Sequence, residues 1–173
     1  GDRVLTRDNG YRTVRWAGHK VLSARQLRMD ESLRPILIRA GAFGRGRPER
    51  DMLVSPQHRV ALMGARVQML TGEDEVLAAA NHLTGHRDIH AVCPKAGVEY
   101  VHFMFDQHEL VLSDGLWTES FQPGLMALAS MEQPQRAELL RLFPELMIGQ
   151  RQEAFGTARP ALRGYQAGVV VSS

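Results

Sequence analysis

From Val4 to about Ser120 this 173-residue chain alternates short apolar runs with turn residues. Asp8-Asn9-Gly10 and Ser113-Asp114-Gly115 contain Asn-Gly and Asp-Gly pairs, which favour tight hairpins. Tyr100 to Phe105 is a run of aromatic and β-branched residues, which is typical of a strand. Runs this short and this regularly interrupted predict a mainly β fold, a sandwich or barrel rather than βαβ units.

The alternation of apolar and polar residues predicts which side chains face the core. We expect inward-facing side chains at Val4, Trp16, Ile36, Ile38, Val54, Val60, Val101, Phe103, Val111 and Leu116. One short helix is expected over 74–83, where Val76, Leu77, Ala80 and Leu83 would share a face.

After Pro123 the apolar residues recur at three- and four-residue spacing, which predicts helices over 124–132 and 134–142. Pro134 suits the first turn of the second helix, and Pro144 ends it. The remainder is rich in Gly, Ala and Arg without a clear period. We therefore expect a β core over 1–124, a helical extension over 125–149 and an irregular tail over 150–173.

Composition narrows the classes of function. The net charge of +2 comes from dispersed arginines, so no basic stripe indicates nucleic-acid binding. No apolar run approaches the roughly 20 residues of a membrane-spanning helix. The single cysteine, Cys93, excludes an intrachain disulfide framework and a cysteine-rich zinc site, and we expect it to be buried and structural.

Three histidines, His82, His86 and His90, have a spacing of four that imitates one face of a metal-binding helix. Gly85 interrupts that helix, and no nearby carboxylate or cysteine completes a tetrahedron. We expect no metal and no cofactor. His102 alternates with apolar neighbours and is expected to be a strand-face residue.

Two polar clusters could carry chemistry. Ser55-Pro56-Gln57-His58 places a histidine after a Ser-Pro turn, and Asp106-Gln107-His108 lies between two predicted strands. Taken alone, the first is more often a structural turn and the second a polar loop. Their joint order with the opening segment favours a functional interpretation.

That order resembles the Hint domain, the self-processing β module shared by inteins and hedgehog C-terminal regions. Gly1 to Gly10 is similar to the segment in which a Gly-Asp-x-Val turn precedes a strand. Ser55 to His58 resembles the Thr/Ser-x-x-His block, and Phe105 to Leu116 resembles the late block with its acidic residue, histidine and Asp-Gly turn. The resemblance covers Gly1 to Gly124 and implies a compact fold of many short strands with a short C-terminal helical extension.

A narrower resemblance concerns Trp16-Ala17-Gly18, Leu53 to Val60 and Glu119 to Gly124. These stretches look like a bacterial Hint subgroup found in large, often secreted proteins. That subgroup implies a secreted or cell-surface parent protein, and the partner would be the flanking polypeptide of the same chain.

In Hint domains an N-terminal cysteine or serine attacks the preceding carbonyl and converts an amide into a thioester or ester. The resemblance implies that His58 protonates the leaving nitrogen, that Ser55 orients it or contacts the same peptide, and that Asp106 and His108 assist across the cleft. The nucleophile and the first strand are expected upstream of Gly1, so this form of the chain is expected to be inactive.

Inteins end in an asparagine that releases the downstream flank, whereas the corresponding residues here are Thr118-Glu119-Ser120. The resemblance therefore favours hedgehog-like cleavage over ligation. Two alternatives stay open. One is a non-catalytic binding or assembly module in a large surface or secreted protein, and the other is an unrelated β domain with coincidental motifs.

Overall fold

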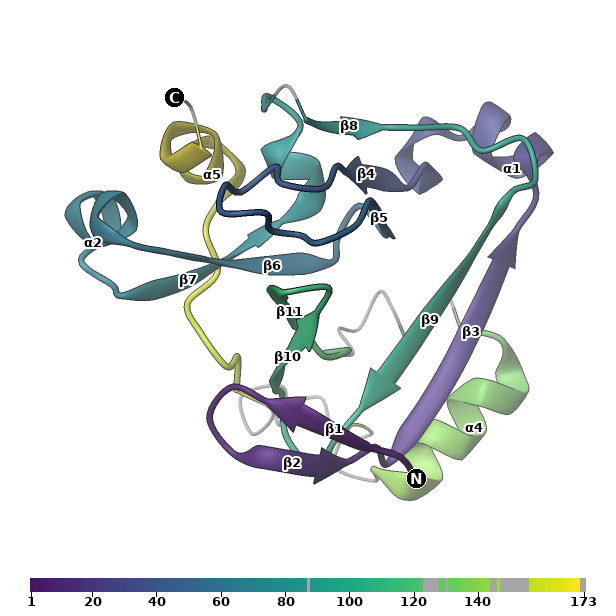
Figure 1. Cartoon of the computed structure of the whole chain (residues 1–173). Helices are drawn as coiled ribbons and strands as arrows, with labels where there is room; N and C mark the ends of the chain where they lie inside the picture. Colours follow the sequence, from purple (N-terminus) through teal and green to yellow (C-terminus); the bar gives the residue numbers. More distant parts are fainter. Residues whose placement is uncertain (87, 123–127, 130, 144–145, 147–155, 172–173) are drawn as a thin grey trace.

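The computed structural model describes residues 1–86, 88–122, 128–129, 131–143, 146 and 156–171 (Figure 1). Within them the largest sheet has six strands in the order β2-β1-β10-β11-β6-β7, and all neighbours are antiparallel. Its strands are β1 (Arg3–Thr6), β2 (Gly10–Thr13), β6 (Arg59–Met63), β7 (Glu75–Ala79), β10 (Leu110–Ser113) and β11 (Leu116–Glu119). This sheet brings together segments that are far apart in the sequence.

Two smaller sheets complete the β structure. The strands β3 (Trp16–Leu22) and β9 (Val98–Met104) form a long antiparallel ribbon, which crosses Figure 1 diagonally. The second sheet has the order β5-β4-β8, also antiparallel. Its strands are β4 (Ile36–Ile38), β5 (Met52–Val54) and β8 (Ile89–Ala91).

Short helices connect and cover these sheets: α1 (Ala24–Met29), η1 (Glu31–Leu33), α2 (Ala65–Thr71), η2 (Ala80–Leu83), α4 (Gln133–Leu142) and α5 (Gly164–Val171). Ser23 begins α1 with a capping box, because its side chain accepts from the Gln26 amide while the Gln26 side chain accepts from the Ser23 amide. Gly72 ends α2 with a φ of 78°, a left-handed conformation that glycine adopts without strain.

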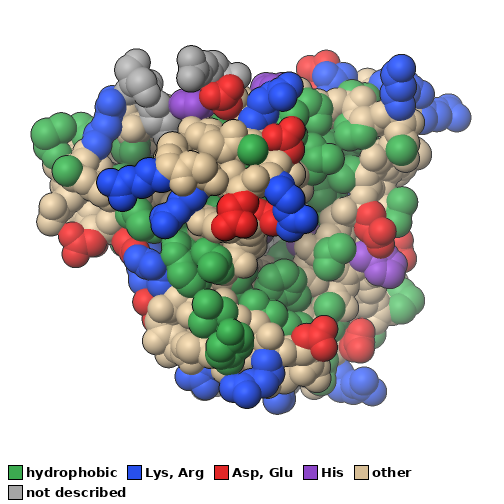
Figure 2. All heavy atoms as spheres, in the orientation of Figure 1, with side chains coloured by type: hydrophobic (Ala, Val, Ile, Leu, Met, Phe, Trp, Pro, Cys, Tyr) green, Lys and Arg blue, Asp and Glu red, His purple; other side chains and the backbone are tan. Residues whose placement is uncertain are grey.

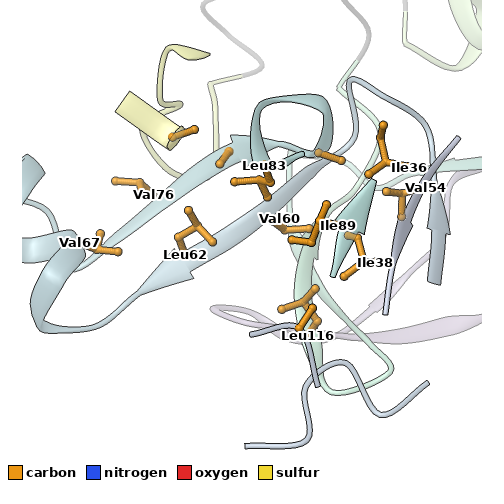
Figure 3. Packing of buried hydrophobic residues seen from close by; sticks show 14 residues of the cluster. Ile36, Ile38, Val54, Val60, Leu62, Val67, Val76, Leu83, Ile89 and Leu116 are labelled. Carbon is orange, nitrogen blue, oxygen red and sulfur yellow. The ribbon is translucent and has the colours of Figure 1, made fainter. Parts of the chain in front are cut away.

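The main core lies between the β6–β7 hairpin and the β4 sheet (Figure 3). Val60 and Leu62 point from β6 toward Val76, Leu83 and Ile38, and helix α5 adds the fully buried Ala167. Apolar burial of this kind stabilises by roughly 25 cal/mol per Å². The hairpin is therefore fixed between two layers.

A second core joins the β3–β9 ribbon to helix α4. Trp16 and Met104 pack there against Leu139 and Phe143. Gln135 Nε2 donates to the carbonyl oxygen of His19 at 2.9 Å, which attaches the helix to β3. The predicted helix over 134–142 is confirmed, with proline in its first turn. The helix expected over 124–132 lies largely outside the described residues.

The mainly β prediction is confirmed, and most of the side chains expected in the core are buried. Val4 and Phe103 are only partly buried, and the expectation for Val101 is wrong, because its residue is 65% exposed. Tyr100 and Met104 face inward instead. Successive side chains of a strand point to opposite faces. An error of one residue in the predicted alternation therefore exchanges the inward-facing and outward-facing residues throughout β9.

The helix expected over 74–83 is wrong for most of its length, since Glu75–Ala79 form strand β7 and only Ala80–Leu83 form a 3₁₀ turn. Both faces of β7 are buried: Val76 lies in the main core, and Leu77 packs with Leu110 on the other side. A strand covered on both faces loses the alternation that identifies strands in a sequence.

Two further expectations are corrected. The tail predicted to be irregular contains helix α5, and residue 161 pairs in parallel with Leu77 at the free edge of β7. Cys93, expected to be buried, is exposed. It lies two residues after the end of β8, in the segment where the chain leaves the sheet.

Charged side chains of both signs occur on the face shown in Figure 2, and basic ones gather at its lower edge, where the β1–β2 hairpin lies. That hairpin carries Arg3 and Arg12. Within the part of the chain that the structure describes, no helix is both long and apolar enough to cross a bilayer.

The register of β9 is testable with two substitutions in the same strand. Met104→Ala removes a fully buried side chain and is expected to lower the free energy of unfolding by about 2–5 kcal/mol. Val101→Ala changes an exposed position and should cost less than about 1 kcal/mol. Urea unfolding measures both, and equal losses would contradict the inward orientation of Met104.

Candidate functional site

Glu119 is a nearly buried carboxylate at the end of β11, with 8% of the residue exposed. Its Oε1 accepts from the backbone N–H of Arg59 at 2.9 Å, and its Oε2 accepts from Arg59 Nη1 at 3.1 Å. His108 Nε2 lies 3.3 Å from the same Oε2, within ion-pair distance but outside regular hydrogen-bond geometry. One carboxylate thus joins β11, β6 and the segment before β10.

The β10–β11 hairpin positions Glu119. Asp114 and Gly115 both have positive φ, 47° and 78°, as a two-residue turn between twisted strands requires. The resulting register places Leu110 opposite Glu119 and Thr118 opposite Val60 of β6. His108, two residues before Leu110, and Arg59, next to Val60, are therefore held beside the carboxylate.

His58 lies in the turn that precedes β6. The turn is closed by the His58 N–H, which donates to the Ser55 carbonyl at 3.0 Å. It is anchored to η2, because the Ala80 N–H donates to the His58 carbonyl at 2.9 Å and the Asn81 N–H donates to the Pro56 carbonyl at 3.0 Å. A turn bonded on both sides holds the histidine rigidly.

The surroundings of His58 favour its neutral form. Burial of its imidazole lowers the pKa below its ordinary 6.5, although the residue as a whole keeps some exposure. The negative charge of Glu119 opposes that change, while Arg59 and His108 reinforce it. An imidazole kept neutral near pH 7 can accept a proton and release it again easily.

His108 is 4% exposed and has a partner on its other ring nitrogen. The backbone N–H of Ala158 donates to Nδ1 at 3.0 Å. When Nδ1 accepts, the proton of a neutral imidazole must be on Nε2, the atom that faces Glu119. His58 and His108, fifty residues apart in sequence, therefore lie close enough to Glu119 and to each other to influence one another's protonation.

Glu119 carries its charge in this setting. Burial by itself raises the pKa of the carboxyl. The neighbouring His108, Arg59 and His58 lower the pKa by more than burial raises it, so the net pKa lies below the ordinary value. Glu119 was not among the residues expected to carry chemistry, although it lies in the stretch Thr118-Glu119-Ser120 that corresponds to the end of an intein. The available signal was an acidic residue at the end of a strand otherwise made of core and β-forming residues.

His102 also borders this site, although the sequence predicted only that it lies on the face of a strand. It lies on the inward face of β9, and burial, then His58, then Lys20 lower its pKa. Its ring packs on Phe121 with 4.8 Å between centroids. The alternation of Tyr100, His102 and Met104 is the signal that identifies this orientation.

Asp106 lies apart from the histidines. Its side chain is 78% exposed, and its Oδ1 is 3.2 Å from Arg15 Nε. It lines a polar cavity of about 450 Å³ together with Arg12, Gln107 and Glu109. The structure thus brings His58 and His108 together, holds Ser55 in the same turn as His58, and places Asp106 in a different environment.

Glu109 is a second buried acid, next to His108 in the chain. It is 2% exposed, and Asn9 Nδ2 donates to its two oxygens at 3.0 and 3.1 Å. Gln107 Nε2 donates to Oε1 at 2.9 Å. These neutral donors attach the β1–β2 turn to the segment that carries His108, so Glu109 helps to hold that segment in place.

Chemically, the cluster combines two imidazoles, of which His58 is held neutral by burial, with a carboxylate and a guanidinium, which suits proton transfer. Among the described residues, no group of three or more His, Cys, Asp or Glu side chains is close enough to hold a metal ion.

The lowered pKa of His58 predicts a pH dependence of stability. Between the folded-state pKa and the ordinary 6.5 the unfolded chain binds more protons, so stability falls as the pH drops below about 6.5. His58→Gln removes this titration and should flatten the decline of the unfolding free energy from about pH 7.5 to about pH 5. His90→Gln, in β8, is the matched control and should keep the wild-type slope. An unchanged slope in His58→Gln would contradict the assignment.

A family model described as the Hint domain matches residues 1–125. Searches of curated proteins and of solved structures gave no significant match. The matched range includes His58, His108 and Glu119 and ends before α4. It covers well over half of the sequence. The chain therefore belongs to the Hint domain family.

Proposed function

We propose that this chain belongs to a self-processing module that cleaves the peptide bond at the upstream boundary of its own domain. The observation that supports the proposal most is the convergence of His58 and His108 on the buried carboxylate of Glu119. A structural role alone needs no second imidazole beside an ionised acid and a buried, neutral His58. General acid–base chemistry needs groups of this type, with pKa values near the working pH.

The reaction is an acyl shift in which His58 moves one proton. A cysteine or serine upstream of Gly1, as the family's chemistry requires, attacks the carbonyl carbon of the residue before it. His58 takes the proton from the thiol or hydroxyl and delivers it to the leaving amide nitrogen. The C–N bond breaks as the C–S or C–O bond forms, and the number of protons is unchanged. An amide nitrogen leaves poorly unless it is protonated, so this transfer limits the step.

Glu119, Arg59 and Ser55 act on this step through His58. The carboxylate stabilises positive charge while the imidazole carries the proton, and Arg59 prevents the carboxylate from keeping that proton. Ser55 defines the turn that aims His58. His102 packs on Phe121, and burial and the nearby His58 lower its pKa, so a second neutral imidazole borders the site.

In the second step water or another nucleophile cleaves the thioester or ester. We assign Asp106 to this step, because its exposed carboxylate borders an open polar cavity that an external nucleophile can enter. Ligation is not part of the proposal. The stretch Thr118-Glu119-Ser120 contains no asparagine, and the Glu119 carboxylate is bound to Arg59 and cannot cyclise in the way an asparagine amide does.

The first test uses the polypeptide extended by its natural upstream residues. If the residue at the boundary is cysteine, added dithiothreitol should cleave the chain just before it, since an external thiolate attacks a thioester. His58→Ala should slow this cleavage by about 10²–10⁴-fold, because the nitrogen then leaves without a positioned acid. Mass spectrometry of the products gives the site and the rate.

His90→Ala and Cys93→Ala are the controls and should cleave at the wild-type rate, because neither residue belongs to the Glu119 cluster. A folded polypeptide that remains intact with thiol would favour the alternative, a non-catalytic binding or assembly module. Loss of cleavage in Cys93→Ala with full activity in His58→Ala would make Cys93 the nucleophile and end the proposed mechanism.

A second test separates the two steps. Asp106→Asn should leave thiol-induced cleavage within about twofold of wild type while slowing cleavage in the absence of thiol by about 10-fold or more, because it removes only the base for the second nucleophile. Asp74→Asn is the matched control, an exposed aspartate at the other end of the large sheet. Equal slowing of both reactions by Asp106→Asn would place Asp106 in the first step instead.

A further inference from the structure

The segment over residues 158–162, here called the edge segment, lies beyond the range of the family match and contacts the candidate site directly. It runs along the free edge of β7. The Leu77 N–H donates to the Pro160 carbonyl, and the Leu162 N–H donates to the Leu77 carbonyl, both at 2.8 Å. These bonds pair the edge segment with β7 in parallel around residue 161. The segment therefore extends the large sheet beyond β7 by one isolated parallel bridge.

One arginine fixes the position of the edge segment along this edge. Arg159 Nε donates to Glu75 Oε2 at 2.9 Å, and its two terminal nitrogens donate to the carboxylate of Asp8 at 3.0 and 2.7 Å. Glu75 also pairs with Arg7, whose guanidinium lies over the Trp117 ring. A two-pronged arginine–carboxylate contact defines orientation as well as distance. The edge segment thus has a single register.

In that register the Ala158 N–H donates to His108 Nδ1 at 3.0 Å. The environment there is apolar, since Ala158 packs against Ala61, Leu77 and Leu110. Without this donor, Nδ1 would be a buried acceptor lacking a partner, which costs about 1–3 kcal/mol. The neutral ring could then exchange its proton between the two nitrogens or rotate.

We propose that the edge segment is a positioning element of the site, in which the Ala158 amide holds His108 as the tautomer protonated on Nε2. In this tautomer the Nε2–H lies beside Glu119, with 3.3 Å between Nε2 and Oε2, and its partial positive charge disfavours protonation of the carboxylate by a proton intended for His58. The role in processing rests on the proposed function. The tautomer itself is a property of the folded chain and is measured without any cleavage.

The direct test is nitrogen NMR on the whole chain labelled with ¹⁵N. An N–H donor bonded to a ring nitrogen gives a scalar coupling between the two nitrogens. We expect this coupling between the Ala158 amide and His108 Nδ1, and ring shifts of a protonated Nε2 and an unprotonated Nδ1 at about pH 8. A His108 ring protonated on Nδ1, or no coupling at Ala158, overturns the proposal.

Two variants test the cause. Ala158→Pro deletes the N–H and should abolish the coupling and shift the tautomer ratio by about threefold to tenfold toward Nδ1 protonation. Arg159→Ala removes the anchor to Asp8 and Glu75 and should shift the ratio in the same direction by a smaller factor. Arg163→Ala, an exposed arginine after the edge segment, is the matched control and should leave the ring shifts unchanged.

Each outcome is decisive. If Ala158→Pro fails to fold, the wild-type coupling and the Arg159→Ala ring shifts still test the proposal. If folded Ala158→Pro keeps wild-type His108 ring shifts, the amide does not set the tautomer and the proposal is wrong. If the tautomer shifts as expected but the extended polypeptide never cleaves, the positioning role stands and the proposed processing function fails.

Discussion

The buried charge of Glu119 is the constraint on which the arrangement of the site depends. A carboxylate removed from water costs several kcal/mol unless donors and opposite charge compensate it. Here the compensation comes from the backbone and side chain of Arg59 and from the edge of the His108 ring. Since these groups belong to β6 and to the segment before β10, satisfying one acid requires three segments to meet.

The same requirement explains why the site is rigid. Arg59 begins β6, and its neighbour His58 ends a turn that is bonded to η2, so the imidazole has little freedom relative to the carboxylate. His108 is held between Glu119 on one nitrogen and the Ala158 amide on the other. Proton transfer benefits from such fixed distances, because donors and acceptors need no rearrangement during the step.

Much of the fold was predictable from local patterns, because turns and short apolar runs are local features. The hairpin at Asp114-Gly115 is an example, since its positive φ angles follow from the residue types. The register of β9 was not predictable, as the strand carries apolar residues on both faces and only tertiary packing decides which face is inner. The inward orientation of His102 was not predictable for the same reason. The predicted helix around Val76 was wrong because β7 is covered on both sides.

The candidate site was predictable only in part. His58 and His108 could be identified from sequence motifs. The role of Glu119 depends on the pairing of β11 with β6, a contact between distant segments that the sequence alone does not reveal.

The parallel pairing of residue 161 with Leu77 also has a consequence for the boundaries of the module. In the described residues β7 ends the row of six strands, and an uncovered outer strand offers its backbone groups to any other chain. The edge segment occupies those groups, and helix α5 packs next to it against η2 and α2. The edge of β7 is therefore covered by residues that lie outside the family match over residues 1–125, so the part of the chain that resists strand pairing between molecules is longer than the matched domain. A protein cut at residue 125 would keep the family's motifs and expose a template for aggregation.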